Sequence, residues 1–196
     1  MNTRGANWFV GLPVATWVGE RLLTTLQASA PPGLRWFKPA DLHLTLAFFG
    51  PVGEAAARRG FAAGGWHHGA VVRLGGLGAF GPRRHFSAIG VEPGEGRETL
   101  VDLIAAGRDG ALRGAGARPD TRPPRPHLTI ARPTRDATAS QRAAVLDWLH
   151  DTPPPAESLT LDRVALYTWA ADRRVRQFDL IDAHPLTLAG DPKSRT

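Results

Sequence analysis

Two short segments of this 196-residue chain carry the same kinds of side chain in the same order. Residues 43–46 read His-Leu-Thr-Leu, residues 127–130 read His-Leu-Thr-Ile, and an alanine follows each copy. Successive side chains of a β-strand point to opposite faces, so each copy places its histidine and threonine on one face and two aliphatic side chains on the other. The aliphatic face can pack in a core while the polar face stays free for chemistry.

The polar residues of the two copies are of the types needed for acid–base chemistry on a phosphate ester. Imidazole titrates near neutral pH, so one of His43 and His127 can take a proton from water while the other gives a proton to a leaving oxygen. The hydroxyls of Thr45 and Thr129 can donate to phosphoryl oxygens. An acid and a base that approach from opposite sides match the in-line displacement at phosphorus, and no covalent nucleophile is required.

Each copy alone also fits an ordinary half-buried strand, in which histidine is a satisfied polar residue and threonine a good strand former. The repetition favours the functional interpretation because it explains why both polar positions recur. It also explains the small fifth residue, since Ala47 and Ala131 would leave room for a bulky substrate group. We therefore expect two imidazoles and two hydroxyls to face one cleft.

The chain resembles the two-histidine phosphoesterases, in particular the RNA 2′,3′-cyclic phosphodiesterases, also called 2′-5′ RNA ligases. Besides the two motifs, the similar segments are residues 8–13, 35–42, 47–50 and 74–80, the Arg-Pro-Pro-Arg-Pro before His127, and Leu166-Tyr167. The chain departs from many relatives at Trp169, where serine is common, and at Phe178, where tyrosine is common. These departures lie outside both motifs and concern the details of nucleotide recognition.

The resemblance implies a role for each motif residue. His43 corresponds to the acid that protonates the leaving 3′ oxygen, and His127 to the base that activates water. Thr45 and Thr129 correspond to phosphate-binding hydroxyls, and Arg132 to a basic residue that contacts the phosphate. The implied activity is hydrolysis of RNA 2′,3′-cyclic phosphate ends to 2′-phosphomonoesters without metal or cofactor, with 2′-5′ ligation as the reverse reaction.

Strict alternation of side chains conflicts with part of this assignment. Counted from His127, Arg132 falls on the packing face, so a bulge or the end of the strand must redirect it if it contacts the phosphate. Counted from His43, Phe49 falls on the cleft face and Phe48 does not. The aromatic residue that stacks on a nucleobase therefore stays open between Phe48 and Phe49.

Other functions remain as alternatives or fail on their context. The same chemistry could act on a small cyclic nucleotide or on the cyclic phosphate of ADP-ribose, and a non-catalytic module that binds RNA ends is a third interpretation. Residues 76–81 match the dinucleotide-binding fingerprint, but a turn and a strand follow them instead of the helix that must face the pyrophosphate. His67, His68 and His85 lack the carboxylate or cysteine pattern of a zinc site. We expect no metal and no cofactor.

Two successive series of strand and helix patterns must position the motifs. The first series has strands at 7–12, at the first motif up to the break at 50–53, and at 70–80, with helices from 14 to about 29 and from 54 to about 63. The second has strands at 86–91, 127–132, 159–167 and 175–181, with a helix around Leu100 and another at 140–149. Gly107 and Gly110 each cost a helix interior up to about 1 kcal/mol, so we expect the helix around Leu100 to end or fray there.

This order of elements predicts an α+β fold of two pseudo-symmetric lobes of antiparallel sheet, with helices on the outer faces and the active-site cleft between the lobes. We expect one catalytic domain over residues 1–196, with lobes at about 7–80 and 86–182. Residues 190–196 are predicted to form a mobile tail.

The composition indicates a basic protein: the net charge is +6, and only Lys38 and Lys193 are lysines among 24 basic residues. A basic surface favours a polyanionic partner, although a GC-rich genome gives the same excess of arginine. The clearest local clusters are Arg83-Arg84, Arg122 with Arg125, and the arginines of 173–176. The chain has no cysteine, no apolar run of membrane-spanning length and no signal-peptide pattern. We expect a cytoplasmic monomer that binds RNA with a 2′,3′-cyclic phosphate end and contacts no membrane.

Overall fold

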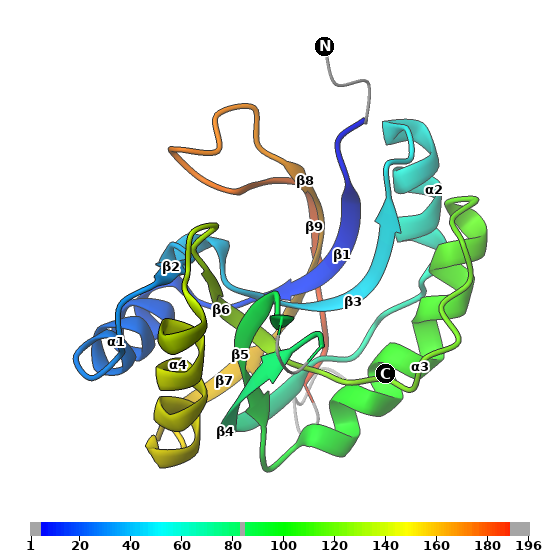
Figure 1. The fold of residues 1–196 in the computed structure, drawn as a ribbon. Coiled ribbons are helices and arrows are strands. Elements are labelled where there is room, and N and C mark those ends of the chain that lie inside the picture. Colours follow the sequence, from blue (N-terminus) through cyan, green and yellow to red (C-terminus); the bar gives the residue numbers. More distant parts are fainter. Residues whose placement is uncertain (1–4, 83–84, 189–196) are drawn as a thin grey trace.

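The computed structural model describes residues 5–82 and 85–188 (Figure 1). Within these residues the chain forms four α-helices, one short 3-10 helix and nine β-strands, which confirms the α+β class. The predicted tail at 190–196 and the Arg83-Arg84 pair lie outside the described residues.

The elements follow one another in nearly the predicted order. They are β1 (Trp8–Pro13), α1 (Thr16–Gln27), β2 (Leu34–Trp36), η1 (Pro39–Asp41), β3 (His43–Gly50), α2 (Glu54–Ala63), β4 (Ala70–Phe80), β5 (Ala88–Pro93), α3 (Arg97–Gly114), β6 (Leu128–Pro133), α4 (Ala139–Asp151), β7 (Ser158–Leu161), β8 (Arg163–Trp169) and β9 (Phe178–Pro185). The strand expected over 159–167 is thus two strands. β7 pairs with β4 and β8 pairs with β1, so the chain crosses from one part of the sheet to another at Asp162.

The two motif strands lie next to each other in the middle of the sheet. The strand order is β7-β4-β5-β6-β3-β1-β8-β9, with β2 added on β6, and the pairs between these strands are antiparallel. One lobe consists of β3 with β1, β8 and β9, and the other of β6 with β2, β5, β4 and β7. These lobes do not coincide with residues 7–80 and 86–182, because β4 pairs with strands of the second half and β8 pairs with β1.

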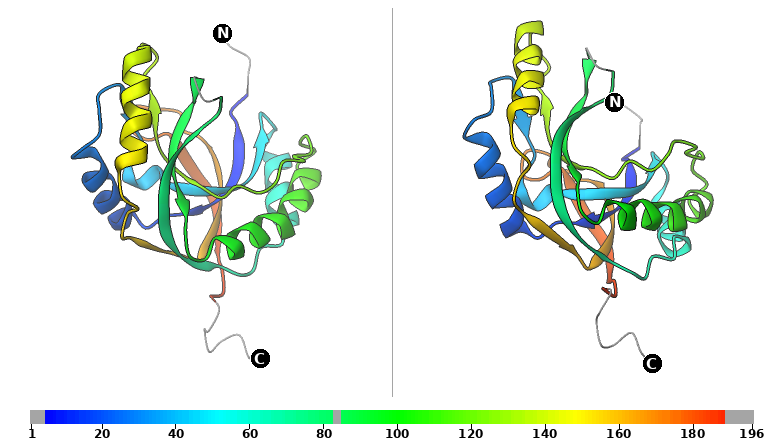
Figure 2. Two further views of the ribbon diagram at one scale, coloured as in Figure 1. Left: turned by 60° about the horizontal axis from the view of Figure 1, so that its bottom comes forward. Right: turned by 90° about the horizontal axis from the view of Figure 1, so that it is seen from below.

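The helices form two pairs on the outside of the sheet. In Figure 1, α1 and α4 lie on the left and α2 and α3 on the right, and the turned views of Figure 2 keep α4 and α3 on opposite sides. Apolar residues at helical spacing form the inner face of α1, where Val18, Leu22 and Leu26 are buried. The helices therefore cover the sheet from two sides and leave its central strands to form the floor of the site.

The prediction that the helix around Leu100 ends or frays at its glycines is wrong, because α3 continues to Gly114. The reason is close packing against α2 and the segment that follows it. A Cβ on Gly107 would lie 2.3 Å from the Trp66 ring, and one on Gly110 would lie 2.7 Å from the Ala63 carbonyl oxygen. Because glycine has no side chain, α3 can lie close enough to Trp66 to bury its ring. The stabilisation from this burial outweighs the low helix propensity of glycine.

Candidate active site

The sheet register brings the two motifs together. Leu44 on β3 pairs with Leu128 on β6, and both side chains are buried. Because the strands are antiparallel, this pair places Thr45 toward His127 and His43 toward Thr129. All four polar side chains are half-buried, whereas their aliphatic neighbours face the core. The junction of the two lobes therefore carries two histidines and two threonines on one face.

Each motif histidine is held by the backbone in the same way. Nδ1 of His43 lies 2.8 Å from the carbonyl oxygen of Asp41, and Nδ1 of His127 lies 2.8 Å from that of Arg125. A carbonyl oxygen only accepts, so Nδ1 carries the proton in both rings. In the neutral imidazole the lone pair is then on Nε2, where it can accept a proton from a substrate or from water.

Three aromatic rings surround His43. Its ring centre lies 4.7 Å from that of Phe9, 5.3 Å from that of Tyr167 and 5.2 Å from that of Phe178, which meets it edge-on. Burial lowers the pKa of His43 to about 4; the bond to the Asp41 carbonyl opposes this shift, and the charge of His127 adds to it. His43 is therefore neutral at pH 7 in the free protein, and its pKa depends on the charge of the neighbouring motif histidine.

The surroundings of His127 are more polar. The ring stacks on Phe80 at 4.1 Å, and the Arg125 guanidinium lies 4.4 Å from the centre of the same Phe80 ring and pairs with Glu92. Burial lowers the pKa of His127, the hydrogen bond to the Arg125 carbonyl and the charge of Glu92 raise it, and the charge of Arg125 lowers it. The net result is a pKa of His127 below the usual imidazole value, because burial and the charge of Arg125 outweigh the hydrogen bond and the charge of Glu92.

A hollow of about 430 Å³ opens beside the motif strands. Thr45, Phe48 and His127 line it, together with Phe80 and three arginines from α3 and the 115–127 loop. Phe48 is 56% exposed at this hollow, whereas Phe49 is buried and its Cζ lies 2.9 Å from the position of a Cβ on Gly60 of α2. Of Phe48 and Phe49, Phe48 is therefore the one whose ring is exposed at this hollow.

The alternation that predicted Phe49 on the cleft face is wrong, because β3 contains irregularities. Its pairing with β1 passes from Thr45 to Ala47 and from Phe48 to Gly50, so Leu46 and Phe49 have no paired partner. An unpaired extra residue shifts the side chains beyond it to the other face. Both Leu46 and Ala47 are consequently buried, and Phe48 points outward.

A similar irregularity redirects Arg132 on β6. The pairing with β5 passes from Thr129 to Ala131, and Arg132 is exposed rather than packed in the core. Its guanidinium lies 5.9 Å from the centre of the Phe37 ring, which stacks on the Phe178 ring beside His43. Arg132 lines a second hollow and not the one lined by Thr45 and His127, so its contact with the phosphate stays a prediction.

Asp41 is a residue of this site to which sequence reasoning assigned no role. Its buried carboxylate accepts the backbone N–H groups of Gln177 (3.0 and 3.1 Å) and Phe178 (3.3 Å), while its carbonyl accepts from His43. One residue thereby fixes both the His43 ring and the Phe178 ring that packs against it. The only local sign of this role is that an acidic residue stands two positions before the motif histidine. The residues that donate to its carboxylate lie 136 and 137 positions further along the chain, so the sequence pattern does not reveal them.

Within residues 5–82 and 85–188, no three His, Asp or Glu side chains form a group that could hold a metal ion. Of the helices in this described part, none has the length and apolar composition to cross a bilayer.

The fold is similar to known crystal structures. LigT of E. coli complexed with NADP+ aligns with a TM-score of 0.71 and 22% identity, over 94% of this chain and 99% of LigT. LigT complexed with 3′-AMP gives a TM-score of 0.71 and 22% identity over 93% of this chain and 98% of LigT. TT0787 of Thermus thermophilus gives 0.69 and 19% over 92% of this chain and 97% of its own. At sequence identities of 19–22%, this structural similarity shows the fold alone.

Sequence comparison identifies the family. The chain matches none of the curated protein sequences. In contrast, the family model of the 2′-5′ RNA ligase superfamily matches residues 15–173, a span that includes both histidine motifs. This match confirms the resemblance to two-histidine phosphoesterases, and the chain belongs to the 2′-5′ RNA ligase superfamily.

Proposed function

We propose that this protein hydrolyses RNA 2′,3′-cyclic phosphate ends to 2′-phosphomonoesters by paired-histidine acid–base catalysis without a metal ion. The observation that carries the proposal is the matched pair of imidazoles at the Leu44–Leu128 junction, each with Nδ1 bonded to a backbone carbonyl and Nε2 left for proton transfer. A threonine hydroxyl lies beside each imidazole, where it can donate to a phosphoryl oxygen. Superfamily membership supports phosphoesterase chemistry.

In the proposed reaction, Nε2 of His127 takes a proton from water as the water oxygen bonds to phosphorus. The bond from phosphorus to the 3′ oxygen breaks, and Nε2 of His43 gives its proton to that oxygen. The product keeps the phosphate on the 2′ oxygen, while His127 has gained the proton that His43 has lost. Thr45 and Thr129 donate to the non-bridging oxygens, and Arg132 adds positive charge.

The proposed roles require a proton on His43 and none on His127 before the reaction. Burial lowers the pKa of His43 to about 4, so this ring is neutral at pH 7 in the free protein. His43 must hold a proton before it can give one, and an anionic phosphate bound against it raises its pKa. Binding of the cyclic phosphate would thus favour the protonated form of His43.

The nucleotide complexes of a relative support a nucleotide substrate. E. coli LigT has been crystallised with 3′-AMP, with NADP+ and with ATP, and it shares the present fold. Here Phe48 presents an exposed ring at the hollow that Thr45 and His127 line. We propose that Phe48 stacks on the base of the terminal nucleotide, since base–aromatic stacking tolerates any sequence.

The test is incubation with a defined RNA that ends in a 2′,3′-cyclic phosphate, followed by identification of the hydroxyl that retains the phosphate. We expect a 2′-phosphate, unchanged activity in chelator, and a loss of about two to four orders of magnitude in turnover for His43→Ala and for His127→Ala. Thr24→Ala, an exposed change on α1, serves as the control. A 3′-phosphate product would reverse the leaving-group assignment, and full activity in either histidine variant would refute the catalytic pair.

Two alternatives give different results in the same assay. Equal or faster hydrolysis of a nucleoside 2′,3′-cyclic phosphate or of the cyclic phosphate of ADP-ribose would indicate a small-molecule enzyme. Binding of cyclic-phosphate ends without histidine-dependent turnover would indicate an RNA-end-binding module. Ligation to a 2′-5′ bond would open the same cyclic phosphate with the 5′-hydroxyl of a second RNA as the attacking group in place of water, and it needs no nucleotide cofactor.

A further inference from the structure

A second hollow, of about 750 Å³, lies where β2, the end of β6, the start of α4 and the loop after β8 meet. Its described lining holds no carboxylate side chain and includes five arginines, which we call the arginine groove: Arg35, Arg132, Arg135, Arg142 and Arg173. Two of these arginines lie opposite each other, because Arg35 on β2 pairs directly with Arg132 on β6. Like charges in facing positions of neighbouring strands destabilise a sheet. The facing pair of Arg35 and Arg132 therefore lowers the stability of the sheet when no negative charge is bound nearby.

The arginines of the groove lack acidic partners in the part of the chain that the structure describes. Seven arginines elsewhere form ion pairs with Asp or Glu, among them Arg58, Arg97 and Arg125, but none of the five does. Burial lowers the pKa of Arg132, and the charges of Arg35 and Arg173 lower it further. The groove therefore concentrates positive charge that a bound anion would neutralise.

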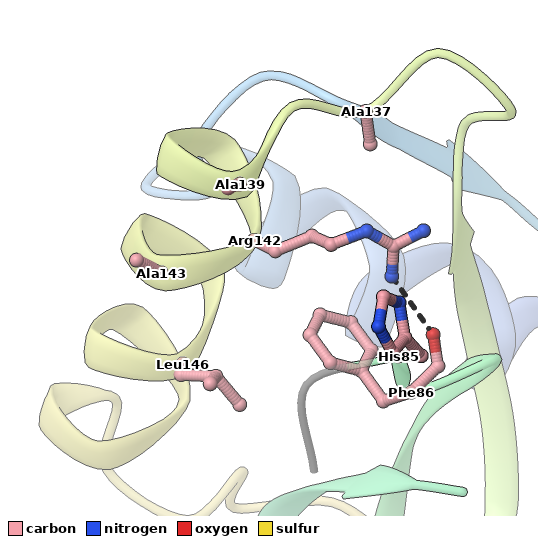
Figure 3. A pocket seen from close by; sticks show the side chains of 7 residues that line it. All are labelled: His85, Phe86, Ala137, Ala139, Arg142, Ala143 and Leu146. Atoms are coloured by element: carbon pink, nitrogen blue, oxygen red, sulfur yellow. Dashed lines mark hydrogen bonds between the residues drawn. The ribbon is translucent and has the colours of Figure 1, made fainter. Parts of the chain in front are cut away.

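Arg142 gives the groove a fixed wall. It extends from α4 across an adjoining hollow and donates to the carbonyl oxygen of Phe86 at 3.0 Å, with its guanidinium 5.3 Å from the centre of the Phe86 ring (Figure 3). Neither partner neutralises it, so the full charge of Arg142 remains in the groove. Arg35, Arg135 and Arg173, by contrast, are exposed, and the guanidinium of Arg173 lies 4.8 Å from the centre of the Trp169 ring.

Contacts of Arg132 link the groove to the aromatic rings beside His43. Arg132 lies three positions after Thr129 on the same strand and packs on Phe37, which stacks on the Phe178 ring beside His43. A chain whose end occupies the histidine pair can therefore continue along β6 into the groove. A strand with several phosphates can contact more of these guanidinium groups than a single small anion can.

We propose that the arginine groove binds the sugar–phosphate backbone of the RNA strand that leads to the cyclic phosphate. This inference rests on the proposed function and specifies its substrate as a strand rather than a mononucleotide. The terminal base lies against Phe48 in the smaller hollow, the cyclic phosphate lies between the histidines, and the preceding phosphates lie on the groove arginines. Contacts of this kind act through charge and carry no base sequence information.

The test compares kinetics on a nucleoside 2′,3′-cyclic phosphate with those on a hexanucleotide carrying the same end. Removing two exposed charges in Arg135→Gln/Arg173→Gln should raise KM for the hexanucleotide about tenfold at low salt, leave kcat unchanged and leave the mononucleotide kinetics unchanged. The dependence of log kcat/KM on log salt should become shallower by about 1.4, which is two single-strand phosphate contacts at 0.7 each. The control Arg59→Gln/Arg73→Gln removes two exposed arginines outside the groove and should change KM less than about twofold.

Several outcomes would overturn the inference. One is an equal effect of the groove and control variants; another is an equal effect of the groove variant on both substrates. If strand length has no effect on KM while inorganic tripolyphosphate inhibits in a manner that needs Arg135 and Arg173, the groove holds a small polyanion and not RNA. If the wild type hydrolyses neither substrate, the proposed function fails; anisotropy with a hexanucleotide ending in a 3′-phosphate then tests the groove, and equal affinity of wild type and groove variant would overturn it.

Discussion

The depressed pKa of His43 predicts a specific loss of stability in mild acid. The pKa is about 4 in the folded protein and about 6.5 in an unfolded chain, so protons bind preferentially to the unfolded state. The stabilising effect of the neutral ring is complete above pH 6.5 and is lost as the pH falls toward 4. As the pH falls from 7.5 to 5, this difference in proton binding lowers the free energy of unfolding by about 2 kcal/mol.

Urea denaturation of the wild type and of His43→Gln at pH 7.5, 6.5, 5.8 and 5.0 measures this contribution. Glutamine does not titrate, so the difference between the two proteins isolates the titration of His43 from that of other groups. We expect the wild type to lose about 2 kcal/mol more than the variant over this interval. Stability curves that run parallel from pH 7.5 to 5 would refute the account of His43 as a buried neutral ring.

Four further changes test other parts of the structure. Asp41→Asn replaces a carboxylate that accepts three bonds from Gln177 and Phe178 N–H groups, and we expect urea denaturation to show a loss of about 1–3 kcal/mol together with lower kcat. Phe48→Ala should raise KM for an oligonucleotide roughly five- to a hundredfold with little change in the melting temperature, whereas Phe49→Ala should cost about 3–5 kcal/mol of stability. Gly107→Ala should destabilise the fold by about 1–3 kcal/mol in thermal melts, against the order of helix propensities.

Part of the fold follows directly from local sequence signals. The strand at 70–80 and the helix at 54–63 have the predicted bounds, because glycine and proline interrupt the periodic segments at 50–53 and 64–65. The faces of the two motifs are also as predicted, since alternation over four residues needs no knowledge of the rest of the chain. Short periodic segments with clear breaks can therefore be predicted from this sequence alone.

The remaining features depend on contacts between distant residues. Nothing in the local pattern of residues 43–50 distinguishes a regular strand from one with unpaired Leu46 and Phe49, so the alternation put the wrong phenylalanine in the cleft. Helix propensity describes an isolated helix and does not include the Trp66 ring that requires Gly107. The pairing of β4 with β5 and β7, and of β8 with β1, likewise joins segments whose partners are set by the whole sheet.

The unequal surroundings of the paired imidazoles have a consequence for the catalytic cycle. Two identical rings in identical environments would have no preferred direction of proton flow, but aromatic rings enclose His43, whereas His127 lies near Glu92. In the proposed reaction, each hydrolytic turnover leaves His127 with a proton and His43 without one. Before the next substrate can react, solvent must discharge one ring and recharge the other, so regeneration of the free enzyme is a step in its own right, and buffer species that shuttle protons should accelerate it.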